Sequence, residues 1–369
     1  MKDRKVIGLG LGALLFTVLL LSPAPEGMSL AAWRVAAVAV LMALWWISEA
    51  LPIAATALLP IALFPLLGVM RTAQVTVSYA DHLIYLFLGG FLIAMAMQRW
   101  ELHRRIALYT IRLVGVSPAR IVLGFMLATA LLSMWISNTA TAMMMLPIAL
   151  AVIGQIERLK PEQAGEDTSR AEGLGTSLML GIAYAASIGG VATLIGTPPN
   201  AILAGVVERL YGYRISFAAW MGFGLPLSLL MLAIAWFYLT RYAYPSGRRS
   251  LPGARELIGR ELAALGSMSG PERWVLTVFA GVALLWIGRG LFKIESLAMV
   301  SDASIAIAGA LLLFIIPADF AKREFLLDWQ TAAKLPWDIL ILFGGGFALA
   351  QGFGDSGLTH GANATAGKY

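Results

Sequence analysis

The chain has no cysteine among its 369 residues, so it cannot form a disulfide, a thiolate metal site or a cysteine nucleophile. Its three histidines, His82, His103 and His360, lie far apart in the sequence. The sequence also lacks an HExxH zinc motif, a GxSxG nucleophile elbow and a Walker A loop. These absences argue against an intramembrane enzyme and against transport driven by ATP bound to this chain.

Charged residues are scarce. They make up 13% of the chain, whereas about 25% is usual in a soluble domain. Hydrophobic residues make up 59%, and the mean hydropathy is +0.79. Runs such as VIGLGLGALLFTVLLLS approach the roughly 20 apolar residues that a spanning helix needs. We therefore expect an all-α polytopic protein in the lipid bilayer of the inner (plasma) membrane.

The basic residues predict an orientation. The net charge of +6 does not indicate nucleic-acid binding, because Lys and Arg lie between the predicted spans. With a cytoplasmic N-terminus, 20 of the 27 Lys and Arg residues fall on cytoplasmic segments, as the positive-inside rule requires. The basic stretch 98–115 is either an amphipathic helix on the cytoplasmic surface or a solvated linker helix. The expected spans lie near residues 6–22, 31–49, 51–69, 83–98, 217–241, 274–290, 302–317 and 338–356, with one more from about 174 to the sequence GTPPN.

One apolar segment, residues 120–153, is too long for a single span and contains Ser137, Asn138 and Thr139 in its middle. We expect a re-entrant hairpin with these residues at its tip, because non-helical backbone inside a membrane must line a cavity or be buried in protein. The helix that begins after the tip would direct free N–H groups at an anion. Oxygen atoms of the same turn could bind Na⁺. A simple helix N-cap or an interhelical hydrogen bond explains the polar residues equally well.

A second interruption is expected in GGVATLIGTPPN, residues 189–200. Gly196, Thr197 and the two prolines would break a membrane helix, exposing carbonyl oxygens before the break and amide groups after it. A broken helix beside a broken hairpin is the arrangement of ion and substrate sites in secondary transporters. A proline kink that adjusts packing is the alternative.

Two segments of the chain repeat. Residues 85–102 align without gaps to residues 341–358, so that Gly89 and Gly90 match Gly345 and Gly346. In the predicted topology the first copy runs inward and the second runs outward. This pattern predicts an inverted-repeat secondary transporter.

The motifs SNTAT (137–141), ATLIGTPPN (192–200) and SEALPIAATALLP (48–60) resemble the divalent anion/Na⁺ symporter (DASS) family. The resemblance runs from about residue 33 to residue 358 and implies a homodimer that works by an elevator mechanism. It implies substrate binding by Ser137, Asn138, Thr139, Thr197 and Pro198. It implies Na⁺ binding by Ser133, Ser137, Asn138 and Gly196.

We therefore expect a sodium-coupled symporter of divalent organic anions, in particular C4-dicarboxylates such as succinate. Na⁺ is preferred to a proton as coupling ion because no Asp, Glu or His lies at the centre of either interruption. Sulfate or citrate transport within the same family stays open. So does a non-transporting membrane remnant or scaffold, whereas a channel fits two helix breaks less well.

The resemblance also suggests how the chain is divided. If the repeat offset holds, a second Ser-Asn-Thr would begin at about residue 393, beyond Tyr369. We therefore expect a C-terminally truncated family member with an incomplete second repeat and impaired transport. The expected parts are scaffold helices with the interfacial helix (1–119), a transport-domain half with hairpin and broken helix (120–245), a cytoplasmic linker (246–272), second-repeat scaffold helices (273–358) and an atypical tail (359–369).

Overall fold

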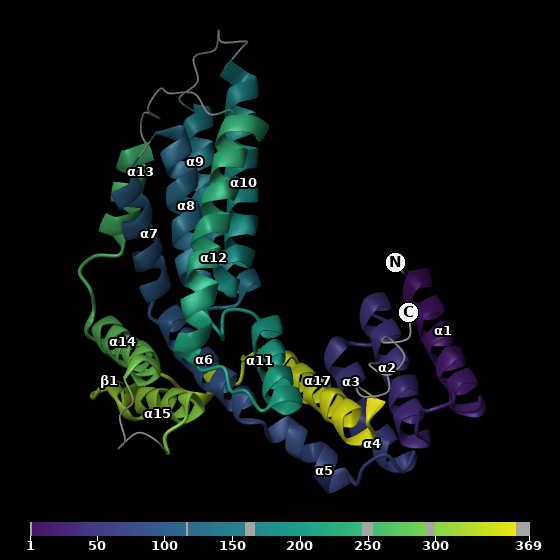
Figure 1. Ribbon diagram of the computed structural model, residues 1–369. Coiled ribbons are helices and arrows are strands. Elements are labelled where there is room, and N and C mark those ends of the chain that lie inside the picture. Colours follow the sequence, from purple (N-terminus) through teal and green to yellow (C-terminus); the bar gives the residue numbers. More distant parts are fainter. Residues whose placement is uncertain (1, 116, 159–166, 246–253, 293–298, 359–369) are drawn as a thin grey trace. The chain divides into compact units, whose positions relative to one another are not determined.

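The computed structural model describes residues 2–115, 117–158, 167–245, 254–292 and 299–358 (Figure 1). The expected tail 359–369 lies outside the described residues, as do residues 159–166 and residues 246–253 of the expected linker. Contacts divide the chain into two units. The first contains Met1–Leu88, Ala201–Ile215 and Pro336–Tyr369, and the second contains Gly89–Asn200 and Ser216–Leu335.

The regular elements among the described residues are α-helices, apart from the short antiparallel pair β1 (Pro317–Asp319) and β2 (Glu324–Phe325) and two single turns of other helix types. Seven of these helical segments are long and apolar enough to cross a membrane. They are Asp3–Leu21, Leu30–Ser48, Thr72–Arg99, Gly173–Val191, Phe217–Ala243, Gly270–Leu291 and Trp337–Ser356. The expectation of an all-α polytopic membrane protein is confirmed.

Two expected spans differ from the structure. Residues 51–69 form two short helices, α3 (Ile53–Ala57) and α4 (Leu59–Leu66). Pro60 causes the break, because a proline has no N–H for the carbonyl four residues earlier and its ring clashes with that carbonyl. The span expected at 302–317 is α15 (Asp302–Ile315), which ends before Pro317 because the residue preceding a proline avoids helical backbone.

The first unit packs around the glycines of α17 (Trp337–Ser356). A Cβ atom on Gly345 would overlap the backbone of Ala57, and one on Gly344 would overlap the ring of Tyr79. The Tyr79 hydroxyl donates a hydrogen bond to the carbonyl of Ala57. The other helices of this unit are α1 (Lys2–Leu21), α2 (Leu30–Ser48), α5 (Thr72–Val77), the start of α6 (His82–Arg99) and most of α11 (Pro198–Tyr211).

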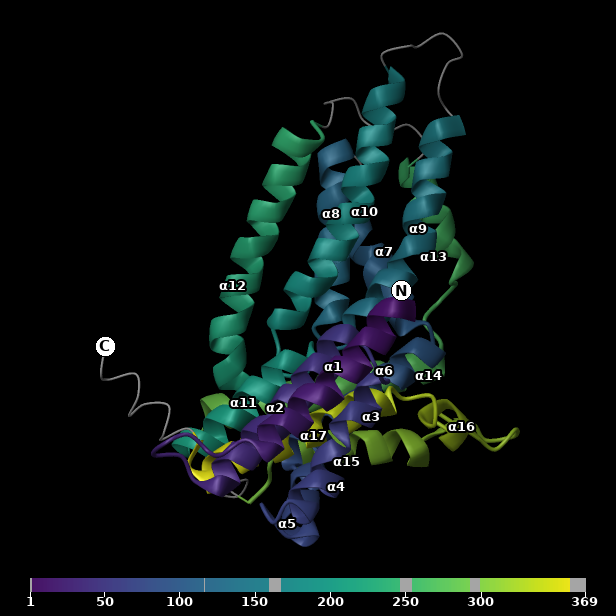
Figure 2. The same ribbon diagram turned by 90° about the vertical axis from the view of Figure 1, so that its right-hand side faces the viewer.

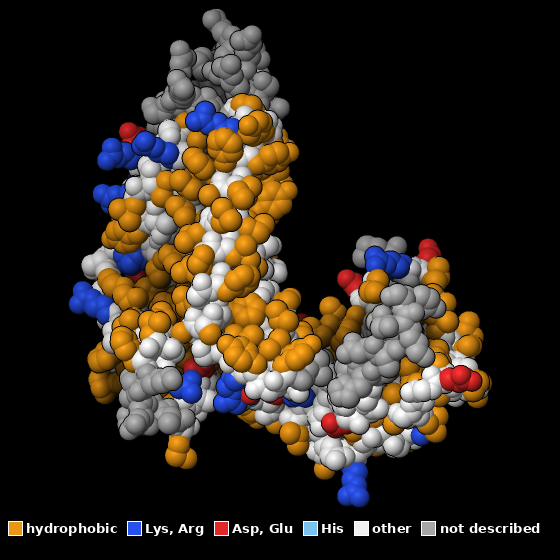
Figure 3. All heavy atoms as spheres, in the orientation of Figure 1, with side chains coloured by type: hydrophobic (Ala, Val, Ile, Leu, Met, Phe, Trp, Pro, Cys, Tyr) orange, Lys and Arg blue, Asp and Glu red, His pale blue; other side chains and the backbone are white. Residues whose placement is uncertain are grey.

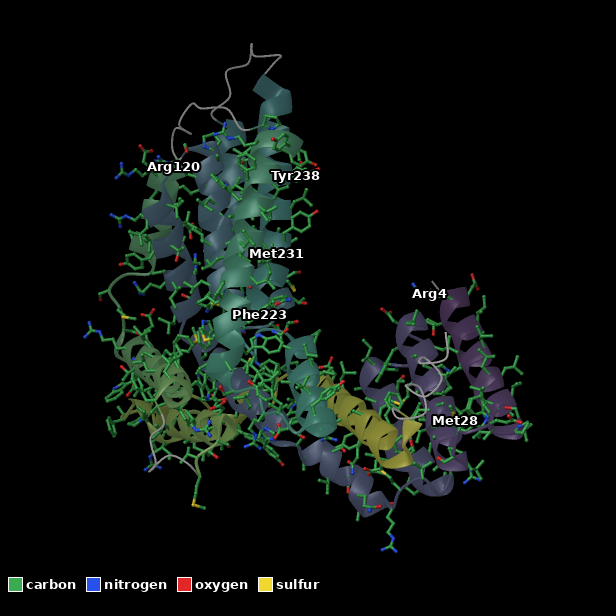
Figure 4. The ribbon with its side chains drawn as sticks, in the orientation of Figure 1. Arg4, Met28, Arg120, Phe223, Met231 and Tyr238 are labelled. Carbon is green, nitrogen blue, oxygen red and sulfur yellow. The ribbon has the colours of Figure 1, made fainter. Side chains whose placement is uncertain are left out.

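The second unit contains four helices that run alongside one another (Figures 1 and 2). They are α8 (Pro118–Ser133), α9 (Asn138–Arg158), α10 (Asp167–Val191) and α12 (Phe217–Tyr238). Along α12 many large apolar side chains face outward (Figure 3). Phe223, Met231 and Tyr238 project from it (Figure 4), and Phe223 is 67% exposed. Such a surface fits a helix in contact with lipid.

The basic stretch expected at 98–115 contains α7 (Leu102–Val114), an amphipathic helix with its apolar side buried. The expected linker 246–272 contains another helix, α13 (Ala254–Ala264), which packs against α7. Arg105 of α7 joins these elements to α14 (Gly270–Leu291). Its guanidinium donates to the carboxylate of Glu272 at 2.9 and 3.1 Å, and to the carbonyls of Leu265 and Gly266 just after α13. One buried charge thus holds three helices together.

Replacing Arg105 by alanine should reduce stability strongly, because it leaves the Glu272 carboxylate buried without its partner. The side chains of Arg105 and Glu272 are only 8% and 6% exposed, and loss of one member of such a pair costs about 3–5 kcal/mol. The neighbouring Arg104 pairs with Glu261 at 34% and 31% exposure, so Arg104→Ala should cost about 1 kcal/mol or less. Thermal unfolding of both variants in detergent measures this difference. Equal melting temperatures would contradict the role given to Arg105.

Candidate binding site

The first half of the candidate site is the turn between α8 and α9. α8 ends at Ser133, the amides of Met134 and Ile136 still bond back to Ala130 and Leu132, and α9 begins at Asn138. The Ser137 hydroxyl accepts from the amide of Ala140 at 3.4 Å. Ser137 is therefore the N-cap of α9.

Three oxygen atoms meet at Ser133, whose side chain is completely buried. Its hydroxyl oxygen lies 2.7 Å from Oδ1 of Asn138 and 2.6 Å from the carbonyl oxygen of Ala186 in α10. A serine hydroxyl carries one hydrogen, so it can donate to only one of these two acceptors. The remaining oxygen pair would be satisfied by an Asn138 amide turned so that Nδ2 faces Ser133, or by a cation bound beside the two oxygens. This donor set of neutral oxygens suits a small, hard cation.

Gly190 of α10 lies directly beside the Asn138 side chain. A Cβ atom on Gly190 would be 2.5 Å from Oδ1 of Asn138, and one on Gly196 would be 2.5 Å from the carbonyl oxygen of Gly190. Neither position has room for a side chain. The two glycines thus allow the turn after α8 and the segment after α10 to approach each other closely.

The second half of the site is the segment 192–197 between α10 and α11. It is linked to the turn by the Thr193 hydroxyl, which donates to the carbonyl of Met134. The sequence predicts that the prolines end the first helix, but α10 already ends at Val191. Pro198 and Pro199 instead occupy the first turn of α11, where a missing N–H costs nothing.

Helix α12 supplies hydrogen bonds to the end of α10. The indole Nε1–H of Trp220 donates to the carbonyl of Val191 at 2.9 Å, and the Ser228 hydroxyl donates to that of Ile188 at 2.8 Å. Between them, a Cβ atom on Gly224 would lie 2.6 Å from the Val191 oxygen. These three residues of α12 are four apart and lie on one face of the helix.

Asn200 of α11 supplies the other hydrogen bonds. Its side-chain Nδ2 donates to the carbonyl of Gly190 at 2.9 Å and to that of Thr193 at 2.7 Å. The carbonyl of Gly189 accepts from the amide of Ala192. Together with the contacts from α12, this gives a partner to each of the last four carbonyls of α10, the groups that a helix end leaves free.

Some backbone groups of the site stay free. Within the described part of the chain, no donor contacts the Gly196 carbonyl, and no acceptor contacts the amides of Asn138 and Thr139. A carbonyl oxygen without a donor can bind a cation, and free amides at a helix N-terminus can bind an anion. The arrangement can therefore hold a small cation and an anion near each other. Among the residues described, no group of three or more His, Asp or Glu could hold a metal ion.

The structure brings Ser133 and Asn138 into contact. Gly196 lies near them, because it packs against Gly190 and Gly190 packs against the Asn138 side chain. Ser137 caps α9, and Thr139 is exposed on its first turn. Thr197 and Pro198 lie half-buried where α11 begins. Among the described residues, no hydrogen bond links Thr197 or Pro198 to the Ser-Asn-Thr turn.

Sequence reasoning missed the residues that cap α10. Asn200 is the last residue of the quoted GTPPN motif and received no role there. The sequence identifies Trp220, Gly224 and Ser228 only as members of an apolar span. Their four-residue spacing, with a glycine between two hydrogen-bond donors, is the signal that could have indicated a face against another backbone.

Known proteins resemble this chain over nearly its whole length. The family model described as "Sodium:sulfate symporter transmembrane region" matches residues 4–364. The protein named sodium-dependent dicarboxylate transporter SdcS from Staphylococcus aureus (strain USA300) is 47% identical over 357 residues, which cover 96% of this chain and 68% of that protein. The protein of the same name from strain COL is 46% identical with the same coverage.

Replacing Gly190 by alanine should destabilise the protein, because the new methyl group would meet Oδ1 of Asn138 at 2.5 Å. Overpacking of this kind costs about 1–3 kcal/mol. Gly175→Ala in the same helix is the matched control. There the nearest atom would be Ile153 Cδ1 at 3.6 Å, an ordinary contact. Thermal unfolding should show a loss for the first variant and none for the second; equal values would mean that Gly190 and Asn138 do not pack as described.

Proposed function

The chain belongs to the sodium:sulfate symporter family, and on that basis we propose that it is a sodium-coupled symporter of C4-dicarboxylates such as succinate. The observation that carries this proposal is the buried group of neutral oxygens around Ser133, where the turn after α8 meets α10. The similarity to proteins named sodium-dependent dicarboxylate transporter supports the choice of dicarboxylate over sulfate or citrate.

In this proposal Na⁺ is bound by neutral oxygens. Ser133 and Asn138 supply their side chains, Ser137 supplies an oxygen from the turn, and Gly196 supplies its free carbonyl. Unwound backbone of this kind coordinates Na⁺ in secondary transporters. A bound cation would also resolve the contact between the Ser133 hydroxyl and its two acceptors.

The substrate carboxylate would bind at the start of α9. The free amides of Asn138 and Thr139 point out of this helix end, where the helix dipole favours negative charge. Thr197, just before α11, and Pro198, its first residue, would line the same substrate site. Na⁺ bound nearby would raise the affinity for the dianion and so couple the two fluxes.

We also propose that the fold is an inverted repeat. The two copies of the glycine motif make equivalent contacts: Gly89 would overlap the backbone of Ala306 if it had a Cβ atom, and Gly345 would overlap that of Ala57. Each glycine helix thus packs closely against a helix from the other half of the sequence, α15 for Gly89 and α3 for Gly345. In this scheme α8 and α9 form a re-entrant hairpin, and α10 with α11 forms a broken helix.

The inverted-repeat scheme also assigns the parts of the chain to a moving domain and a fixed scaffold. Segment 120–245 is the transport-domain half, and segments 1–119 and 273–358 form the scaffold. The transport domain would move by an elevator mechanism within a homodimer in the plasma membrane. The N-terminus would be cytoplasmic, as the distribution of Lys and Arg favours.

Na⁺ should stabilise the protein through Ser133. Replacing choline chloride by NaCl should raise the melting temperature of the unsubstituted chain, because a ligand that binds only the folded state stabilises it. Ser133→Ala should remove this increase. Ser187→Ala is the control, since Ser187 lies on α10 near the site but is exposed. An increase that survives in Ser133→Ala would remove Ser133 from the ion site.

Uptake of labelled succinate into vesicles should depend on Na⁺. Replacing external Na⁺ by choline should reduce it to background, and Asn138→Ala should reduce it at least about a hundredfold, because that side chain serves both the ion and the turn. An excess of unlabelled sulfate or citrate should compete weakly. Strong competition by either anion would reassign the substrate, and uptake unchanged in choline would reject coupling to Na⁺.

A further inference from the structure

We propose that Trp220, Ser228 and Asn200 are positioning residues for the ion site: by bonding the terminal carbonyls of α10, they end that helix at Val191 and keep the Gly196 carbonyl available to Na⁺. The inference rests on the proposed function. It adds a role for three residues that need not touch either the ion or the substrate.

The end of α10 at Val191 leaves carbonyl groups that need hydrogen-bond donors. A buried carbonyl without a hydrogen bond lowers stability, and three of the last four carbonyls of α10 depend on side-chain donors from α11 and α12. Without donors from α11 and α12, segment 192–197 could rewind onto α10 to satisfy them. An uncapped carbonyl of Val191 would also compete with Gly196 for the cation.

Helix α12 approaches the end of α10 closely. The donors Trp220 and Ser228 stand one helical turn on either side of Gly224. Only a residue without a side chain at position 224 lets the backbone of α12 lie against the oxygens of Val191 and Ala192, at 2.6 and 3.1 Å from the Cβ position. Trp220, Gly224 and Ser228 therefore form one surface that fits the end of α10.

The Asn200 side chain spans the break. Its amide group bonds one carbonyl before the break, Gly190, and one within it, Thr193. Because Gly190 also contacts the Asn138 side chain, the position of Asn200 fixes both sides of the ion site. The side chain is only 6% exposed, so water does not replace these bonds readily.

Two tryptophans on the same helix provide a matched test. Trp220 donates to the carbonyl of Val191 at 2.9 Å, and Trp236 donates to the carbonyl of Ala119 at 2.8 Å, far from the break. Phenylalanine keeps an aromatic ring in place and removes the donor. Trp220→Phe should raise the Na⁺ concentration for half-maximal succinate uptake about tenfold, which corresponds to loss of one hydrogen bond to a buried group. Trp236→Phe should stay within about twofold of the unsubstituted chain.

The readout separates positioning from general destabilisation. At saturating Na⁺, Trp220→Phe should have a KM for succinate close to that of Trp236→Phe, because the substrate contacts are intact. A shift in half-maximal Na⁺ that is equal in both variants would overturn the inference. An unsubstituted chain that shows no response to Na⁺ would instead contradict the proposed function, and this inference with it.

A second variant decides the matter if Trp220→Phe does not fold. Asn200→Asp has the same shape, but its carboxylate cannot donate to the carbonyls of Gly190 and Thr193. It should lower the affinity for Na⁺. The Na⁺ concentration that gives half of the maximal rise in melting temperature should therefore increase about tenfold or more. An unchanged midpoint would show that capping of these carbonyls does not position the site.

Discussion

A helix that ends in apolar surroundings leaves its last carbonyl oxygens without hydrogen bonds, and α10 ends in this way at Val191. The candidate site depends on how these oxygens are satisfied. Side chains of α11 and α12 bond three of them, and the turn after Val191 bonds the fourth. Because the break is stabilised from outside, the segment 192–197 can keep a non-helical conformation. A free carbonyl is then available for an ion.

The hairpin turn and the broken helix form one site because glycines let them meet. Gly190 accommodates the Asn138 side chain, and Gly196 approaches the carbonyl of Gly190. The Ser133 hydroxyl joins Asn138 to the backbone of α10 at Ala186. A cation at this point would therefore touch groups from both interruptions at once. Binding of Na⁺ and the shape of the substrate site would be coupled through a few direct contacts.

The sequence predicted the parts of the site that are local in the chain. A polar triplet in an apolar segment indicated the turn at 134–137, and a glycine and proline cluster indicated the break near Gly196. The residues that cap α10 could not be predicted in the same way, because Trp220 and Ser228 act on carbonyls about 30 to 40 positions earlier. The division of 51–69 into α3 and α4 was readable from Pro60, but the apolar length of that segment suggested a single span.

The central claim is that Na⁺ binds where the turn and the break meet. Amide hydrogen exchange of the purified chain, followed by mass spectrometry in NaCl and in choline chloride, tests it most directly. The account predicts that Na⁺ slows exchange in two segments together, residues 133–141 and residues 186–200, because one ion contacts both. Equal exchange in the two salts, or slowing in only one of these segments, would contradict it.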